Sequence, residues 1–174
     1  MTPFELEKTL SNIKVTVDTR EQATTALADR LSDISFEYER KKLDFGDYSC
    51  KVTLTDGAEI DFATKFAIER KMNIDELATC FTSKRKRVTA EFERAVEAGA
   101  KIYLLVENAS FEKIIAEKYR SKVNHNALVA SIFAFLARYN CQIVFCKPET
   151  SGRIIREILY REVKEYLQNM EVPI

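Results

Sequence analysis

The fold is decided by residues 46–71, which read GDYSCKVTLTDGAEIDFATKFAIERK. Three runs in this stretch have strand character and are separated by turn signals. They are residues 47–54, 58–62 and 67–71. Asp56-Gly57 stands between the first two runs and predicts a β-hairpin. The stretch therefore predicts part of a β-sheet whose last strand ends in three consecutive charged residues, Glu69, Arg70 and Lys71.

Helices and further strands are predicted on both sides of this stretch. Towards the N-terminus we expect a helix from Pro3 to about Ser11, a strand over 13–17, a helix over 24–31 and a strand over 36–42. Towards the C-terminus we expect helices over 84–98, 110–119, 124–139 and 148–168, strands over 101–106 and 142–146, and a helix capped by Asn73 with Glu76 in the box position. This order predicts a single α/β domain over 1–174 with a mixed central sheet flanked by helices. Its parts are an N-terminal helix (1–12), a core (13–146) and a C-terminal helix (148–168).

Composition excludes several classes of protein. The 174 residues carry 27 Lys and Arg against 27 Asp and Glu, so the formal net charge is zero. A histone-like polycation and an acidic disordered tail are thereby excluded, but local clusters of charge still allow a nucleic-acid site. Four glycines, widely spaced, form no glycine-rich phosphate loop, so we expect no nucleotide cofactor.

The four cysteines and the hydropathy pattern indicate the compartment. The cysteines form no C-x-x-C pair, which favours free buried thiols. The N-terminus has no signal-peptide pattern, and no stretch approaches the roughly 18 apolar residues of a membrane span. We expect a cytoplasmic protein without a membrane partner.

Glu69 and Lys71 give the most specific indication of a catalytic site in the sequence. Residues two apart on a strand point to the same face, so these two side chains project together while Arg70 points away. A carboxylate beside a lysine suits metal-assisted phosphodiester hydrolysis: the carboxylate holds Mg²⁺, and the lysine orients or helps to deprotonate the attacking water and offsets developing charge. Alternating charge on an exposed strand gives the same pattern without any function.

Four more acidic residues fall near this pair or at strand ends, where sites in α/β sheets gather. They are Asp18, Glu21, Asp47 and Asp75. Each has an ordinary structural interpretation, such as turn chemistry for Gly46-Asp47 and a first-turn helix acid for Asp75. Taken together, they favour a site.

Three blocks of sequence resemble the nuclease domain of the XPF family, whose members are structure-selective DNA endonucleases. The blocks are Val17-Asp18-Thr19-Arg20-Glu21, Gly46-Asp47-Tyr48, and Ile68-Glu69-Arg70-Lys71 followed by Asp75. The family pattern of Gly-Asp, then Glu-Arg-Lys, three residues and Asp is matched without substitution, and the resemblance covers about residues 13–145. The likeness is greatest to single-domain nucleases of bacteria and their phages.

The resemblance implies a restriction-endonuclease-like core and assigns roles to these residues. Asp47 and Glu69 would be the principal Mg²⁺ or Mn²⁺ ligands, and Lys71 would position the nucleophilic water. Arg70 and Asp75 would support the site, Asp18 would lie at its edge as a ligand or behind one, and Arg20 and Glu21 would help to hold the substrate or the loop. Hydrolysis would leave a 5′-phosphate and a 3′-hydroxyl.

The chain departs from the family in two respects. After Phe145 we expect neither the usual tandem helix-hairpin-helix module nor a helicase, and Glu91 stands where Gln is expected. Both features bear on selectivity for branched DNA.

A basic cluster follows the candidate site. Lys84, Arg85, Lys86 and Arg87 stand where a helix begins, and positive charge there opposes the helix dipole. This arrangement favours a phosphate partner, so we expect these four residues and Arg20 to contact DNA. Arg40-Lys41-Lys42 and Arg120-Ser121-Lys122 are possible extensions of the contact. His125, between two asparagines at a helix start, is expected to face solvent.

The sequence predicts a metal-dependent DNA endonuclease that acts on branched, flap or fork duplexes. A non-catalytic DNA-binding module of the same fold is the first alternative, and a general α/β phosphodiesterase or nucleotide-binding domain is the second. The last helix carries one apolar face, at Ile154, Ile155, Ile158, Leu159, Val163 and Leu167. This face is expected to pack inside the molecule and is also a candidate for pairing two copies as a homodimer.

Overall fold

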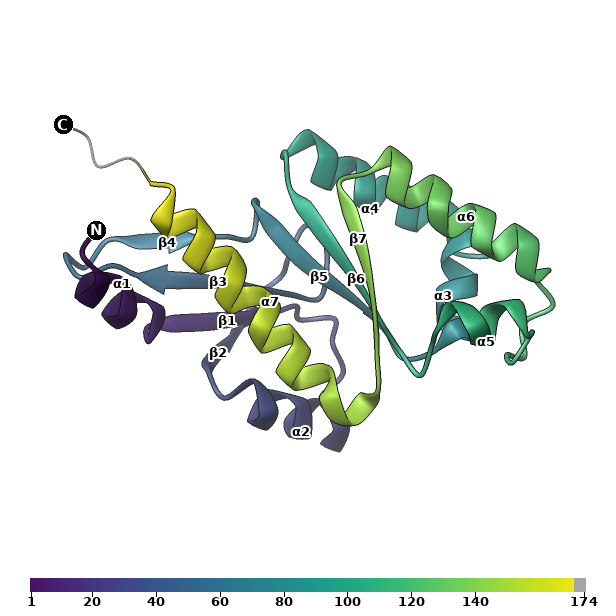
Figure 1. Ribbon diagram of the computed structural model, residues 1–174, viewed down its shortest axis with the longest axis horizontal. Helices are drawn as coiled ribbons and strands as arrows, with labels where there is room; N and C mark the ends of the chain where they lie inside the picture. The colour runs from purple at the N-terminus through teal and green to yellow at the C-terminus, as the bar shows by residue number, and fades with distance from the viewer. Residues whose placement is uncertain (171–174) are drawn as a thin grey trace.

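One seven-stranded mixed sheet runs through the computed structural model, which describes residues 1–170 (Figure 1). The strand order is β2-β1-β3-β5-β6-β7, and β4 pairs with the outer part of β3. The strands are β1 (Ile13–Val17), β2 (Glu37–Arg40), β3 (Tyr48–Thr53), β4 (Glu59–Asp61), β5 (Phe66–Lys71), β6 (Lys101–Glu107) and β7 (Cys141–Cys146). The last four residues of the expected domain, 171–174, lie outside the described part.

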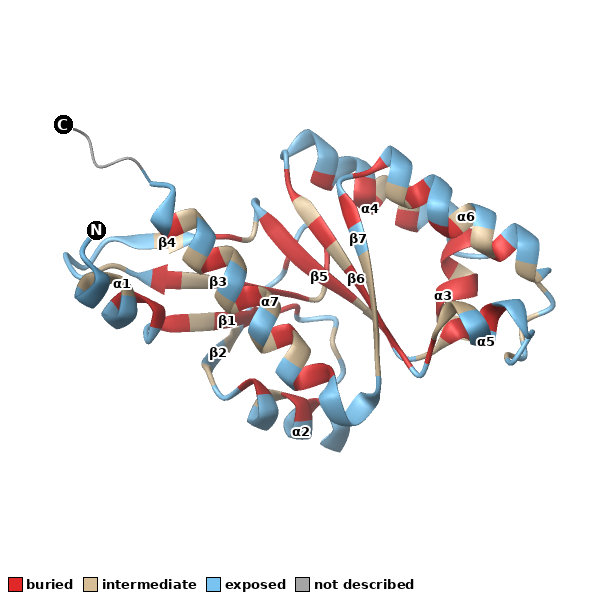
Figure 2. Ribbon diagram, viewed as in Figure 1, coloured by how far each residue is buried: buried red, intermediate tan, exposed pale blue. Residues whose placement is uncertain are grey.

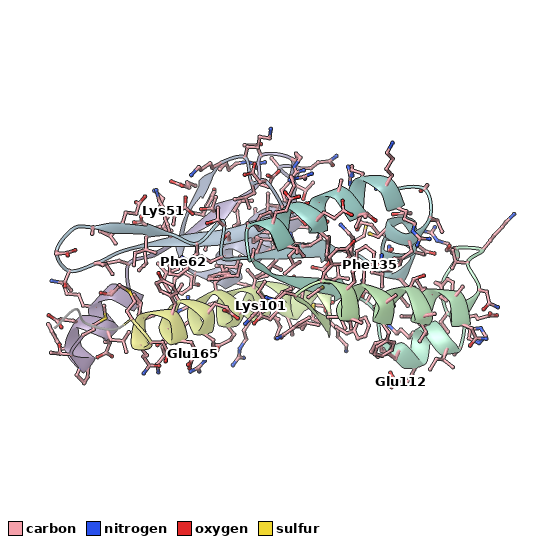
Figure 3. The ribbon with its side chains drawn as sticks, turned by 90° about the horizontal axis from the view of Figure 1, so that it is seen from above. Lys51, Phe62, Lys101, Glu112, Phe135 and Glu165 are labelled. Atoms are coloured by element: carbon pink, nitrogen blue, oxygen red, sulfur yellow. The ribbon has the colours of Figure 1, made fainter. Side chains whose placement is uncertain are left out.

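Helices cover both faces of this sheet. They are α1 (Pro3–Leu10), α2 (Thr25–Ile34), α3 (Ile74–Phe81), α4 (Arg85–Glu97), α5 (Phe111–Ile115), α6 (His125–Arg138) and α7 (Pro148–Gln168). Helices α1, α2 and α7 bury one apolar cluster with β1, β3 and β5, and α3 to α6 bury another with β5, β6 and β7. Figure 2 shows the buried residues concentrated on the strands and on the helix faces turned towards them. In Figure 3, Phe62 of the first cluster and Phe135 of the second lie well apart along the molecule. The expected mixed α/β sheet flanked by helices is confirmed.

Strand directions bring the charged segments to one edge of the sheet. β1 and β5 both run antiparallel to β3, and β5, β6 and β7 run parallel to one another. The carboxyl ends of β1, β5 and β6 therefore meet the amino end of β3. Asp18 follows β1, Asp47 precedes β3, and Lys71 and Glu107 end β5 and β6. Residues far apart in sequence thus share one edge.

Two helices end differently from the expectation. The helix expected over 24–31 continues to Ile34 and ends at Ser35, which takes a left-handed φ of 53°. The helix expected over 110–119 is only the five-residue α5, because the chain turns at Ala116 and Glu117 takes a φ of 52°. The loop that follows, residues 116–124, is therefore longer than predicted.

Two other expectations concern helix ends and faces. Asn73 caps α3 as expected, but the Glu76 carboxylate accepts the N–H of Met72 rather than that of Asn73, so the reciprocal half of the capping box is missing. The apolar face of α7 is buried against the sheet, which leaves it unavailable for pairing two copies. None of the helices within residues 1–170 combines the length and apolar character that crossing a membrane requires.

Candidate active site

Gly46 lets the chain approach β5 closely just before Asp47. Its φ is +73°, and a Cβ at this position would lie 2.6 Å from Cβ of Ala67. The Gly46 N–H donates to Oε1 of Glu91 at 3.0 Å, and the Asp47 N–H donates to the Ile68 carbonyl at 2.8 Å. Asp47 is therefore fixed against β5 by its own backbone.

The Asp47 carboxylate faces the end of β5. Its Oδ2 accepts the backbone N–H of Arg70 at 2.8 Å. Burial and the charge of Glu69 raise the pKa of Asp47 well above its ordinary value, although Lys71 and the Arg70 N–H oppose the shift. The charge of Glu69 thus adds to burial in disfavouring the ionised form of Asp47.

Glu69 and Lys71 lie side by side and are both buried, with Nζ of Lys71 bonded to Oε1 of Glu69. Burial raises the pKa of Glu69; the charge of Lys71 lowers it and that of Glu91 raises it, and the net shift is upward. Burial alone would lower the pKa of Lys71, but the carboxylates of Glu69 and Asp47 outweigh it and hold that pKa above its ordinary value. Lys71 is therefore a cation at neutral pH.

Asp18 holds the loop that follows β1. Its carboxylate accepts the backbone N–H groups of Arg20 and Leu43, both at 2.7 Å, and two donors of the Arg20 guanidinium. Burial raises the pKa of Asp18, but these hydrogen bonds outweigh it and keep the pKa below its ordinary value. The structure places Asp18 behind Arg20, and both of its oxygens are already engaged.

A buried polar network lies beneath the carboxyl ends of β5 and β6. Glu107 receives a two-pronged contact from Arg70, at 2.7 and 2.6 Å, and a further hydrogen bond from Arg30 at 3.3 Å. Arg30 also donates to the Tyr48 hydroxyl, which in turn donates to Glu21 at 2.9 Å. Glu21 is thereby linked to Arg70 through three side chains, those of Tyr48, Arg30 and Glu107.

These groups line a cleft of about 680 Å³ at the sheet edge. Its acidic residues include Asp47, Glu69 and Glu91, and its cations include Arg20, Lys71, Lys84 and Arg87. The full lining is Arg20, Glu21, Gln22, Thr24, Ala26, Arg30, Asp47, Glu69, Arg70, Lys71, Met72, Glu76, Lys84, Arg87 and Glu91. A carboxylate pair with a lysine at the centre and further cations around it can bind a phosphodiester and stabilise charge that develops on it.

The structure brings together eight of the residues singled out from the sequence. Glu21, Asp47, Glu69, Arg70 and Lys71 line the cleft together with Arg20, and from the basic cluster Lys84 and Arg87 join them. Arg85 and Lys86 are exposed outside the cleft lining. Asp75 also lies outside the lining, and its carboxylate binds backbone N–H groups of Arg120 and Ser121. His125 bonds Glu117 at 2.7 Å, away from the cleft.

Sequence reasoning missed Arg30 and Glu107 and gave no site role to Glu91. Arg30 stands in an ordinary amphipathic helix, and Glu107 comes at the end of an apolar strand. The position of Glu107 could have identified it, since an acidic residue at the carboxyl end of a buried parallel strand lies at the edge of the sheet where sites form. No pattern in the neighbouring sequence identifies Arg30 as a site residue, because its partners Tyr48 and Glu107 lie 18 and 77 residues away in sequence.

The donor set fits a divalent cation. Mg²⁺ prefers oxygen ligands and is commonly held by one or two carboxylates together with substrate phosphate. Asp47 and Glu69 supply two such carboxylates, and a cation between them would relieve the repulsion that raises the pKa of Asp47. Over residues 1–170 no group of three or more His, Cys, Asp or Glu side chains forms a complete metal cage, so substrate and water would supply the other ligands.

Comparison with known proteins gives one family and one fold. A family model of the ERCC4 domain matches residues 17–158. The structure of XPF from Aeropyrum pernix superimposes with a TM-score of 0.64 at 18% identity, covering 92% of this chain and 66% of that chain. XPF from Aeropyrum pernix in complex with DNA gives a TM-score of 0.60 at 19% identity, covering 91% and 68%. This chain thus spans about two thirds of the length of those proteins. No curated protein sequence matches it.

Proposed function

Because this chain belongs to the ERCC4 domain family, we propose that it is a divalent-metal-dependent DNA endonuclease that cuts branched, flap or fork duplexes. The observation that carries the proposal is the cluster of Asp47, Glu69 and Lys71 in a cleft that is also lined by Arg20, Lys84 and Arg87. The cations suit the phosphates of DNA, and the carboxylates suit Mg²⁺ or Mn²⁺. The DNA bound to the Aeropyrum pernix protein of the same fold supports this substrate.

Asp47 and Glu69 would hold the metal ion, which when bound supplies Lewis-acid stabilisation of the charge that develops on the phosphate. The Arg70 N–H fixes one oxygen of Asp47, and Lys71 holds one oxygen of Glu69. Both carboxylates are therefore oriented before substrate arrives, which lowers the reorganisation required during reaction.

Lys71 lies in the cleft beside Glu69, so it is placed to orient the attacking water or a phosphate oxygen. The water oxygen forms a bond to phosphorus, the bond from phosphorus to O3′ breaks, and O3′ takes up a proton. The water proton passes to solvent, and the products are a 5′-phosphate and a 3′-hydroxyl.

The other site residues hold the loops and the DNA. Asp18 fixes Arg20, and Glu21 is tied to Tyr48, so the loop after β1 presents Arg20 to the cleft. Lys84 and Arg87 would bind phosphates next to the scissile bond, with Arg85 and Lys86 on the adjoining helix surface.

Cleavage of labelled fork, flap and linear duplexes tests the proposal. We expect Asp47→Ala and Lys71→Ala each to slow cleavage by about 100-fold or more, since the first removes a proposed metal ligand and the second removes the cation that orients the water or the phosphate. Asp44→Ala, an exposed acid in the same loop, and Lys65→Ala, an exposed lysine just before β5, are the matched controls and should cut normally. EDTA should abolish cleavage, and added Mg²⁺ or Mn²⁺ should restore it.

Two results would contradict the proposal: wild-type protein inert on every substrate, or Asp47→Ala and Lys71→Ala as active as their controls. Salt-sensitive DNA binding without cleavage would favour the alternative, a non-catalytic DNA-binding module of the same fold.

We further propose that two copies pair through α5, α6 and β7. Phe133 of α6 and Ile115 of α5 are exposed by 53% and 59%, and Phe111 stacks on Phe133 with ring centres 5.4 Å apart. β7 is an edge strand beside this apolar patch.

Light scattering at tens of micromolar tests this pairing. The wild type should have twice the 20.0 kDa mass of one chain, and Phe133→Glu should have the mass of a single chain. Phe4→Glu, at an exposed phenylalanine of α1, should leave the dimer intact, and a monomeric wild type would refute the pairing.

A further inference from the structure

The loop between α5 and α6, residues 116–124, has a fixed shape. It begins where Glu117 takes a left-handed φ of 52°, and the Lys118 N–H returns to the Lys113 carbonyl at 2.9 Å. Across the loop, the Tyr119 hydroxyl donates to the Val123 carbonyl at 2.7 Å. These contacts close the loop on itself but do not attach it to the rest of the molecule.

Asp75 makes the polar attachment, which adds to the packing of Tyr119 and Val123 against the apolar cluster of α3 to α6. Its Oδ1 accepts two successive backbone N–H groups of the loop, from Arg120 at 2.7 Å and from Ser121 at 2.6 Å. A charged acceptor shared by two backbone donors is a strong and directional contact. One carboxylate oxygen on α3 thus fixes the middle of a loop that lies 45 residues further along the chain.

The first turn of α3 connects this attachment to the cleft. Met72 and Glu76, on either side of Asp75 in sequence, line the cleft, whereas Asp75 does not. The Met72 carbonyl is also contacted by Asn108, the residue after β6, at 3.5 Å. A single short segment therefore forms the rim of the cleft with one set of side chains and holds the loop with another.

The loop presents positive charge to solvent. Lys118, Arg120 and Lys122 are all exposed, and the Arg120 side chain is 89% exposed. The acidic residue within the loop, Glu117, is bonded to His125 at 2.7 Å. Among the described residues, Lys118 and Lys122 make no ion pair, and Arg120 has only a 3.5 Å contact with Asp75.

We propose that Asp75 is a positioning residue that holds loop 116–124 as a second DNA contact, at which Lys118, Arg120 and Lys122 bind the phosphate backbone of a duplex arm flanking the cleft. The proposal rests on the proposed DNA endonuclease function. It gives Asp75 a role outside the chemistry, as the acceptor of two backbone hydrogen bonds from the loop. Asparagine keeps an Oδ1 acceptor at that place and alanine does not, so the two substitutions separate the roles.

The attachment itself is tested by hydrogen exchange, without DNA. The Arg120 and Ser121 amides should be protected in the wild type and in Asp75→Asn, and should exchange faster in Asp75→Ala. Equal protection in Asp75→Ala would overturn the role of Asp75.

The DNA contact is tested by fluorescence anisotropy with a labelled fork duplex in EDTA, over a series of salt concentrations. Lys118→Ala/Arg120→Ala/Lys122→Ala should raise Kd by about tenfold or more, and should reduce the slope of log K against log salt by about three, one for each lost phosphate contact. The control is Lys8→Ala/Lys65→Ala/Arg161→Ala, which removes three exposed cations of other elements and should leave both quantities within about twofold of the wild type. A loop variant that binds like the control would overturn the contact.

Steady-state cleavage in Mg²⁺ completes the test. Asp75→Ala should raise KM as the triple loop variant does and leave kcat within about twofold, and Asp75→Asn should restore KM. A loss of kcat of about tenfold or more in both Asp75→Asn and Asp75→Ala would overturn the proposal and make the carboxylate part of the chemistry. If the wild type binds DNA but cuts nothing, the endonuclease proposal fails while the binding comparison still decides the loop; if it binds no DNA, both proposals fail.

Discussion

Gly46 decides where Asp47 stands. It combines a left-handed φ of +73° with a backbone so close to β5 that a Cβ would meet Ala67 at 2.6 Å and the Ile68 carbonyl oxygen at 3.2 Å. Neither contact can be relieved without moving a strand. The position of the first carboxylate of the site therefore depends on the residue before it having no side chain.

We expect Gly46→Ala to destabilise the protein by about 2 to 4 kcal/mol, from backbone strain and overpacking together, and to slow cleavage by at least about tenfold because Asp47 is displaced. Gly57→Ala is the matched control: Gly57 also has a positive φ, +89°, but a Cβ there would meet nothing within 4 Å. It should lose only about 1 kcal/mol, with normal cleavage. Urea denaturation and cleavage rates measure both effects. Equal losses in the two variants would show that the close approach to β5 is unimportant.

Glu91 adds a third negative charge beside Glu69. Its Oε1 accepts the Gly46 N–H, which a glutamine Oε1 can also do, while its charge raises the pKa of Glu69. Glu91→Gln should therefore keep the fold and lower the pKa of Glu69. If catalysis needs ionised Glu69, the acidic limb of the pH profile for kcat/KM moves to lower pH. Glu93→Gln, at an exposed residue of the same helix, should leave the limb in place. A limb that stays fixed or moves upward in Glu91→Gln would contradict this coupling.

At the scale of single residues, the sequence predicted the site residues whose roles follow from their neighbours in sequence. Glu69 and Lys71 follow from the period of a strand, and Asp47 follows from its turn. Arg30 and Glu107 could not be found this way, because each acquires its role only when α2, β5 and β6 come together. Asp75 shows the converse: its spacing from Lys71 fits the family pattern, yet its nearest partners are backbone groups of a distant loop.

Among the secondary-structure elements, helices α2 and α7 pack closely against each other. Gly152, near the start of α7, faces α2 so closely that a Cβ would lie 2.6 Å from the Arg30 carbonyl oxygen and from Cβ of Asp33. In the same turn, Ser151 accepts a hydrogen bond from Arg30 at 3.2 Å. The contact between the helices thus also sets the position of an arginine in the polar network.

Gly152→Ala has two opposing effects on the stability of the protein. Helix propensity alone would stabilise α7 by roughly 0.5–1 kcal/mol. The clash is with backbone, which cannot rotate away, so we expect a net destabilisation of about 1–3 kcal/mol. Thermal unfolding shows whether Gly152→Ala raises or lowers the stability of the protein. Arg153→Ala, at the exposed neighbouring residue, is the control. A rise in Tm would show that α2 shifts without cost.

The elements themselves were largely predictable, and their ends and pairing were less so. Capping residues marked the starts of α1 and α3, and apolar runs marked β1, β6 and β7. The early end of α5 was not visible, because the following residues have helical composition and the turn at Glu117 depends on the anchored loop. The order of the strands was also hidden, since β3 pairs with β1, β4 and β5 and the sequence does not rank these partners.

Across the whole molecule, Glu107 joins segments that belong to different apolar clusters. It is 2% exposed and pairs with Arg30 of α2 and Arg70 of β5. Glu107→Gln should lower the free energy of unfolding by about 3–5 kcal/mol, because the buried Arg30 and the half-buried Arg70 lose their charged partner. Denaturation at pH 7 measures the loss. The matched substitution Glu149→Gln, at an exposed residue of α7, should cost less than about 1 kcal/mol.

The contribution of Glu107 depends on pH. Burial raises the pKa of Glu107, but the hydrogen bonds and charge of Arg70 outweigh it, so the pKa in the folded protein lies below the ordinary value of 4.5. A depressed pKa means that the stabilisation is complete above about pH 4.5 and is lost as the pH falls below that value. The difference in unfolding free energy between wild type and Glu107→Gln should therefore narrow under acidic conditions. A difference that stays constant down to acid unfolding would refute the assignment.

The packing of α1 on α7 places Met1 and Met170 on the rim of the same groove, so both ends of the described chain lie together (Figure 1). Helix α7 has 21 residues and runs from Ser151, which touches Arg30 of the cleft, towards that groove. At 1.5 Å per residue the helix is about 30 Å long. A fluorophore or surface tether attached at Met1 would therefore sit about one helix length from the cleft. Single molecules could be immobilised there while long DNA enters and leaves freely, which makes this chain suited to watching one cleavage event at a time.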